Sequence, residues 1–128
     1  KLKDSGVDVT DEHVIQPHSG DETAIHYHAK CASALIGKQH GYIANCECPV
    51  EADNPNSDNE IDCLLWGNED RLSYAVEIEH SPTEKVKREK LDKYVKKTAV
   101  DELVLINAND LSHHVLTLDD QLRAELGL

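Results

Sequence analysis

Large aromatic and flexible apolar side chains are almost absent from this sequence of 128 residues, which has no Phe, no Met, one Trp and four Tyr. Hydrophobic residues still make up 39%, so Val, Ile, Leu and Ala must build the core of a single domain. No stretch approaches the about 18 consecutive apolar residues of a membrane span, and no charged-then-apolar leader opens the chain. We therefore expect a cytoplasmic protein, and the missing initiator Met suggests a processed chain or a fragment of a larger protein.

The CxxC pairs of many zinc sites are also absent, although the chain has four Cys and eight His. Cys46 and Cys48 lie two apart in a strand-like run, which predicts that both thiols share one face of a sheet. With His28 and Cys31 on a predicted helix, they could hold a tetrahedral zinc ion. We favour the alternative that the thiols are buried and behave as small hydrophobic side chains.

Positive charge is scarce, since 13 Lys and Arg face 25 Asp and Glu and leave a net charge of −12. Such a balance normally argues against binding of nucleic acid. However, seven basic and only three acidic residues lie within 84–97, so this segment carries +4 and the rest of the chain −16. An acidic body suits a halophilic organism, because salt at 1 M screens charges beyond about 3 Å. The candidate DNA-binding residues of the basic segment are Lys85, Lys87, Arg88, Lys90 and Lys93.

Hydrophobic periodicity predicts a mixed α/β domain over 21–128 after an N-terminal arm over 1–20. The sequence Ser81-Pro82-Thr83-Glu84 predicts a capping box at the start of the central helix. Predicted helices cover 21–38, 81–97 and 118–126. Predicted strands cover 42–48, 60–66, 73–79 and 101–107. A loop over 51–59 connects the first two strands, and a turn over 67–70 connects the second to the third. The order αβββαβα predicts three layers around a mixed sheet, with the apolar last strand buried on both faces and parallel to its neighbour.

Three carboxylates fall on two neighbouring strands of this fold. Asp62 lies in the second strand, and Glu77 and Glu79 share one face of the third, so all three are expected to lie close together. Carboxylates gathered beside apolar strands repel one another unless a cation binds, and hard oxygen ligands suit Mg²⁺ or Mn²⁺. Glu22 and His26, one helical turn apart, could reach the same site. The alternative is that this face is solvated and its carboxylates are ordinary surface residues.

The basic segment follows Glu79 directly, where a cation-rich surface would receive a phosphate backbone. The segments EIDCLL, YAVEIEHS, PTEKVKREKLDKY and ELVLI, in this order after a helix, resemble the core of the PD-(D/E)xK nuclease-like superfamily over about residues 20–110. The similarity is to its archaeal and plasmid-associated members. It implies a three-layer α-β-α restriction-endonuclease-like core with a mixed sheet, and hydrolysis of DNA with Mg²⁺ or Mn²⁺.

The resemblance also assigns roles to single residues. Asp62 and Glu77 match the metal ligands of the family, whereas Glu79 stands where the family pattern has Lys. Glu79 would then be a further metal ligand or a general base. Some members of the family carry Glu-x-Glu at this place, and others supply the lysine from the following helix.

Lys90 is the candidate for such a displaced lysine because it stands four residues before Tyr94 in the Lys-x3-Tyr helix, and Lys87 is the next candidate. Lys90 would stabilise the negative charge of the transition state. Glu22 matches an acidic residue that many members carry on the first helix. The alternative for Lys90 is an ordinary solvated lysine on a basic helix.

Three function hypotheses follow. The first is a metal-dependent DNA endonuclease or nuclease domain that hydrolyses phosphodiester bonds, acting as a monomer or a homodimer. The second is a catalytically inactive module of the same fold that binds DNA or a protein partner in a plasmid, viral or conjugative system. The third is a small zinc-stabilised binding protein that uses the Cys and His residues.

Overall fold

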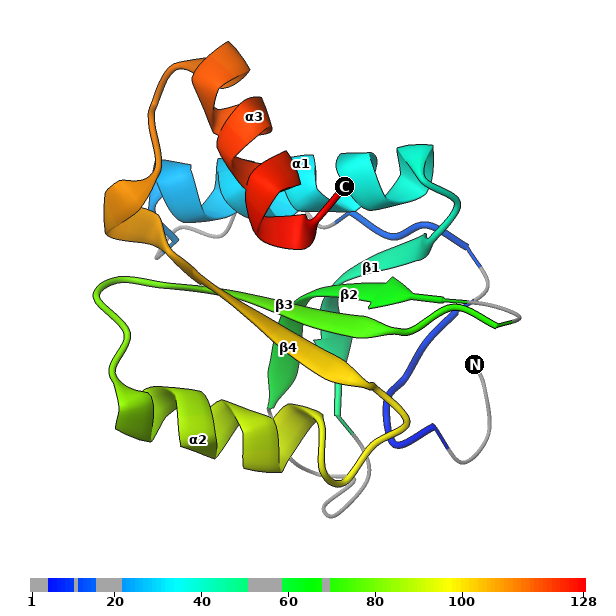
Figure 1. Ribbon diagram of the computed structural model, residues 1–128. Helices are drawn as coiled ribbons and strands as arrows, with labels where there is room; N and C mark the ends of the chain where they lie inside the picture. Colours follow the sequence, from blue (N-terminus) through cyan, green and yellow to red (C-terminus); the bar gives the residue numbers. More distant parts are fainter. Residues whose placement is uncertain (1–4, 11, 16–21, 51–58, 68–69) are drawn as a thin grey trace.

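A four-stranded mixed sheet separates the helices into two layers, with α1 (Ala24–Gln39) and α3 (Val115–Leu126) on one face and α2 (Glu84–Tyr94) on the other (Figure 1). The computed structural model describes residues 5–10, 12–15, 22–50, 59–67 and 70–128. It confirms the predicted mixed α/β class. The elements are α1 (Ala24–Gln39), β1 (Ile43–Pro49), β2 (Glu60–Trp66), β3 (Tyr74–Glu79), α2 (Glu84–Tyr94), β4 (Glu102–Asn107), the 3-10 helix η1 (Ala108–Asp110) and α3 (Val115–Leu126).

The strands are ordered β1-β2-β3-β4, antiparallel except for the parallel pair β3 and β4. The register between β2 and β3 runs from Leu65 opposite Tyr74 to Cys63 opposite Val76 and stops there. Asp62 and Glu77 come next on the two strands, so they lie where the regular ladder has ended. This is the place where the candidate site forms.

The sheet has a hydrophobic core on each face. Val76 and Ile78 pack under α1 and α3, whereas Ala75 packs on the opposite face with Tyr94 of α2. Side chains along β3 therefore alternate between the two faces of the sheet, as in a regular strand. The described part of the N-terminal arm joins the α2-side core, where Val7 and Val9 are buried near the end of β1.

Two helices begin later than predicted because threonines cap them. Thr23 accepts a hydrogen bond from the backbone of α1, so Glu22 precedes the helix instead of lying in its first turn. Thr83, and not Ser81, caps α2, and Ser81 instead has a positive φ of 50°. α2 ends at Tyr94, short of the predicted end near residue 97, and α3 begins three residues early. The predicted loop over 51–59 lies outside the described residues except for residue 59, and of the predicted turn over 67–70 only the two end residues are described.

The prediction that β4 is buried on both faces is wrong. Leu103, Val104 and Leu105 are only half-buried, because β4 is the last strand of the sheet and has a neighbour on one side only. The predicted parallel pairing of this strand after the crossover helix is confirmed.

The prediction that Cys46 and Cys48 share one face is also wrong. Cys46 packs in the core under α1, and Cys48 packs in the core on the α2 side. Between them Glu47 has a φ of +53°, which breaks the regular alternation of the strand. Both thiols are buried, as is that of Cys63.

Gly67 follows β2 at a close approach of two backbone segments. A Cβ atom at this position would lie 2.4 Å from the carbonyl oxygen of Leu72 and 2.7 Å from that of Arg71. Because backbone atoms cannot rotate away, we expect Gly67→Ala to lower the free energy of unfolding in urea by about 1–3 kcal/mol. The exposed control Thr117→Ala on α3 should change it by about 0.5 kcal/mol or less. Unchanged stability of Gly67→Ala would contradict the close approach.

Candidate functional site

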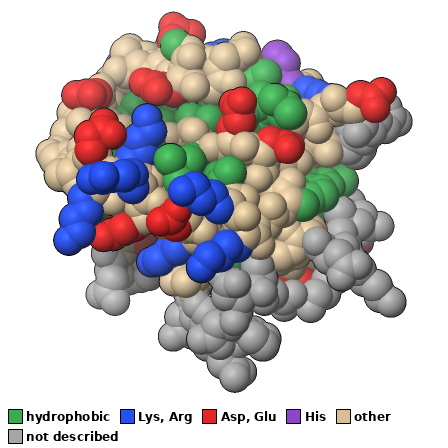
Figure 2. Space-filling model, turned by 60° about the horizontal axis from the view of Figure 1, so that its bottom comes forward, with side chains coloured by type: hydrophobic (Ala, Val, Ile, Leu, Met, Phe, Trp, Pro, Cys, Tyr) green, Lys and Arg blue, Asp and Glu red, His purple; other side chains and the backbone are tan. Residues whose placement is uncertain are grey.

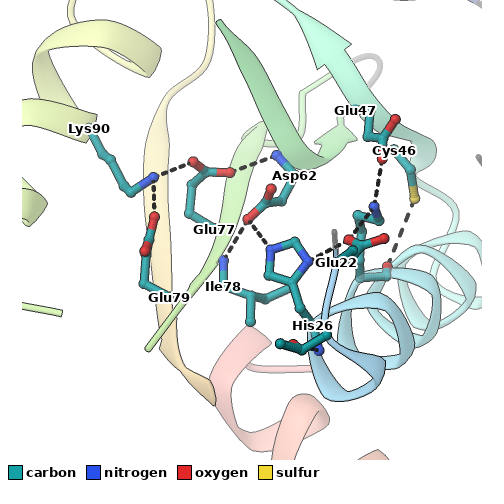
Figure 3. Close-up of polar contacts among 11 residues, drawn as sticks. Glu22, His26, Cys46, Glu47, Asp62, Glu77, Ile78, Glu79 and Lys90 are labelled. Atoms are coloured by element: carbon teal, nitrogen blue, oxygen red, sulfur yellow. Dashed lines mark hydrogen bonds and ion pairs between the residues drawn. The ribbon is translucent and has the colours of Figure 1, made fainter. Parts of the chain in front are cut away.

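Two carboxyl groups fill the gap between β2 and β3 where their ladder ends (Figure 3). The backbone N–H of Asp62 donates to Oε2 of Glu77 at 2.6 Å, and the backbone N–H of Ile78 donates to Oδ2 of Asp62 at 2.9 Å. Each strand thus satisfies a backbone donor of the other through a side chain. The predicted closeness of Asp62 and Glu77 is confirmed by these contacts.

On the α1 side, a chain of charged contacts leads to Asp62. His26 Nε2 lies 3.2 Å from Oδ2 of Asp62, and its Nδ1 lies 2.5 Å from Oε2 of Glu22. The same oxygen of Glu22 accepts from Lys30 Nζ at 2.7 Å, and Lys30 also donates to Glu47 on β1 at 2.8 Å. Helix α1 therefore holds Asp62 from one side through alternating acids and bases.

On the α2 side, Lys90 joins both carboxylates of β3. Its Nζ lies 2.7 Å from Oε1 of Glu77 and 2.8 Å from Oε1 of Glu79, and it lies 5.6 Å from the ring centroid of Tyr94. Glu77 is only 2% exposed, so the solvated-face alternative is wrong for this residue. Glu79 is partly exposed at 38%. The two acids of β3 are therefore joined through the lysine.

Burial and neighbouring charge shift the acids of the site in opposite directions. Burial and the charge of Asp62 raise the pKa of Glu77 to about 8, against the opposing effect of Lys90. Burial also acts to raise the pKa of Asp62, but hydrogen bonds from His26 and the Ile78 backbone outweigh it and hold the pKa below its usual value. The bond to Asp62 is the main cause that raises the pKa of His26 to about 9. Near neutral pH, Asp62 is therefore the carboxylate and His26 the imidazolium.

The structure brings the predicted acids and Lys90 into one network through His26. Glu22, Asp62, Glu77, Glu79 and Lys90 all belong to it. The other candidate basic residues are exposed on α2, namely Lys85, Lys87, Arg88 and Lys93.

Two members of the network, Lys30 and Glu47, are absent from the sequence prediction. A signal for Lys30 was present, because it stands four residues after His26 on the helix face that faces the site. Glu47 gave no signal, since its place depends on the positive φ that turns β1 at this residue.

The donor chemistry of Asp62 and Glu77 suits Mg²⁺ or Mn²⁺, because these ions prefer carboxylate oxygens and a cation between the two acids would relieve the repulsion that helps to raise the pKa of Glu77. Lys90 and His26 contact these carboxyl groups in the structure. Among the described residues, no group of three or more His, Cys, Asp or Glu is arranged to hold a metal ion.

The residues considered for zinc are dispersed. His28 and Cys31 line a groove of about 380 Å³ between α1 and α3. Cys48 packs on the other face of the sheet, in the core beside α2. These donors therefore do not converge on one tetrahedral site.

The basic residues of α2 gather on one side of the molecule. Figure 2, turned to bring the underside of Figure 1 forward, shows Lys and Arg side chains together with interspersed acidic groups. The inner side of the same helix supplies Lys90 to the buried carboxylates. One helix therefore connects the network to a surface rich in positive charge.

Searches against protein-family models, curated proteins and solved structures gave no match. In the part of the chain that the structure describes, no helix has the length and apolar character to cross a membrane.

The network predicts how stability depends on pH. His26 and Glu77 bind protons more tightly in the folded protein, so their stabilising effect is lost as pH rises through the folded pKa values of about 9 and about 8. We expect the free energy of unfolding to fall by several kcal/mol between about pH 6 and 9, because the unfolded chain releases the protons of both groups at lower pH than the folded protein does and one pKa unit is worth about 1.4 kcal/mol. Urea unfolding at several pH values measures this change.

His26→Gln should make this pH dependence shallower above pH 6.5, the ordinary pKa of His, and should leave the part that Glu77 contributes up to about pH 8. The matched control is His28→Gln, at an exposed position of the same helix, which should keep the wild-type curve. Parallel curves for His26→Gln and the wild type would show that His26 carries no extra proton affinity in the folded state.

Proposed function

We propose that this chain is a metal-dependent nuclease domain of the PD-(D/E)xK type that hydrolyses phosphodiester bonds in DNA. One observation carries the proposal: Lys90 reaches from α2 to within 2.7 Å of Glu77 and 2.8 Å of Glu79. A lysine thus lies beside the two acids of β3, although the strand itself carries Glu where the family pattern has Lys. We also propose that the sheet and helices have the arrangement of a restriction-endonuclease-like core.

Asp62 and Glu77 would hold the Mg²⁺ or Mn²⁺ ion, which when bound would lower the pKa of an attacking water and neutralise charge on the phosphate. His26 and the Ile78 backbone fix the orientation of Asp62 through two hydrogen bonds to one carboxylate oxygen. The preorganised carboxylate avoids rearrangement during the reaction.

Lys90 keeps its proton, because the two carboxylates outweigh the effect of burial and raise its pKa. It would stabilise the negative charge that develops on the phosphate in the transition state. Glu79 is the more exposed of the two acids that touch Lys90, so we assign it the role of accepting a proton from water.

A second candidate is a non-cleaving DNA-binding module of the same fold. The engagement of Glu77 by Lys90 and of Asp62 by His26 favours it, because both carboxyl groups already have cationic partners without a divalent ion. This module would bind DNA through α2 but leave it intact.

Cleavage of supercoiled plasmid with Mg²⁺ or Mn²⁺ tests the nuclease directly. We expect nicking by the wild type that EDTA abolishes, and a loss of about 100-fold in both variants, because Glu77→Gln removes an oxygen ligand of the ion and Lys90→Met removes the cation that would stabilise the transition state. The matched control is Lys96→Met, since Lys96 is 70% exposed and pairs with the exposed Asp92. Equal background nicking by wild type and Glu77→Gln would end the enzyme hypothesis.

DNA binding by α2 is tested in the Glu77→Gln background, in which we expect cleavage to be about 100-fold slower. Replacement of the four exposed basic residues Lys85, Lys87, Arg88 and Lys93 by Gln should weaken binding and flatten its salt dependence. The slope of log K against log salt should fall by about 0.9 for each phosphate that the variant no longer binds. Lys38→Gln, at an exposed position of α1, is the control and should keep the wild-type slope. An unchanged slope in the fourfold variant would exclude α2 as the DNA-binding surface.

A further inference from the structure

Lys30 is the most deeply buried charged side chain of the network. Only 1% of it is exposed, and its ammonium group lies between Glu22 at 2.7 Å and Glu47 at 2.8 Å. The two carboxylates outweigh the effect of burial and raise its pKa, so Lys30 keeps its charge inside the protein. A buried ion pair is weak grounds for stability, because apolar residues that replace the whole pair often do as well. Stability alone therefore does not explain why Lys30 is buried between two acids.

Lys30 binds a single oxygen that also serves His26. Oε2 of Glu22 accepts from Lys30 and contacts His26 Nδ1 at 2.5 Å. The opposite nitrogen of the same ring contacts Asp62 at 3.2 Å. Within the described residues, Oε1 of Glu22 is buried without a hydrogen-bond partner. Glu22 is thus held by one oxygen, and Lys30 ties that oxygen to β1 through Glu47.

We propose that Lys30 is a positioning residue: by anchoring Glu22 it fixes the His26 ring, which in turn fixes Asp62 in the site. This inference rests on the proposed function for its consequence in catalysis. The hydrogen bonds of Lys30 go to Glu22 and Glu47, so it acts on Asp62 through the two residues between them. Removing the direct outer partner of a metal ligand, here His26, typically costs about 10- to 100-fold in metal affinity or activity, so we expect the lower end of this range for Lys30.

The test compares Lys30→Met with Lys38→Met, the same substitution at an exposed position of the same helix. Binding of Mn²⁺ alone, measured by electron paramagnetic resonance, should weaken about tenfold in Lys30→Met and stay unchanged in the control. Plasmid cleavage should fall by a similar factor. Wild-type affinity and cleavage in a folded Lys30→Met would overturn the inference.

Glu47→Asn supplies a second route to the same answer, because Lys30→Met leaves two acids without their cation and could fail to fold. Glu47 is 32% exposed, and Asn tolerates the positive φ at this position but is too short to reach Lys30 in the same way. Weakened Mn²⁺ binding in this variant would support the anchoring role. Wild-type binding would show that the anchor on β1 has no effect on the site.

A double variant tests whether Lys30 acts through Glu22. If it does, Lys30→Met adds nothing once Glu22→Gln is present, so the double variant should bind Mn²⁺ and cleave DNA as Glu22→Gln alone does. Additive losses would overturn the route through Glu22.

A further readout needs neither metal nor DNA. The ¹⁵N resonances of the His26 ring, recorded at one pH, should change in Lys30→Met and stay in place in Lys38→Met, because only the former frees the partner of the ring. An unchanged His26 spectrum would show that Lys30 does not orient the ring. If the wild type fails to cleave DNA, the proposed function fails, and this spectrum still decides the role of Lys30.

Discussion

The structure around the candidate site depends on the point where β2 and β3 stop pairing. Beyond Cys63 and Val76, the backbone donors of Asp62 and Ile78 have no partner in the ladder. Buried N–H groups require acceptors, and here the carboxyl groups of Glu77 and Asp62 provide them. This arrangement places two acids between apolar strands, where each acid needs a neighbouring cation. The basic side chains of α1 and α2 meet that need.

Acidic and basic side chains alternate along most of the network, so nearly every charge has a neighbour of opposite sign. From β1 to α2 the order is Glu47, Lys30, Glu22, His26, Asp62, Glu77, Lys90 and Glu79. Two acids adjoin only between Asp62 and Glu77, and the raised pKa of Glu77 reflects burial together with the repulsion there. A proton on Glu77 relieves this repulsion at neutral pH, and on the proposed function a divalent cation would take its place, which is why the junction is the centre of the proposed site.

Much of this could be predicted from local patterns. The alternation along β3 separated Glu77 from Val76, and the hairpin brought Asp62 beside Glu77. The burial of Lys30 could not be predicted, because a lysine on a helix normally faces water and its partner Glu47 depends on an irregular turn of β1. The half-buried state of β4 could not be predicted either. An apolar run such as 103–106 occurs both in central strands and in edge strands, so the sequence does not distinguish the two.

Helix α2 explains how an acidic chain could still meet a phosphate backbone. Its inner side gives Lys90 to the carboxylates of β3, and its other positions carry exposed basic residues, so positive charge is concentrated at one place. A cation bound by Asp62 and Glu77 would compete with Lys90 for Glu77, and Glu79 would hold the lysine beside the site once Glu77 binds the cation. On the proposed function, the glutamate that departs from the family pattern therefore has a role besides accepting a proton from water: it anchors the lysine that the strand lacks.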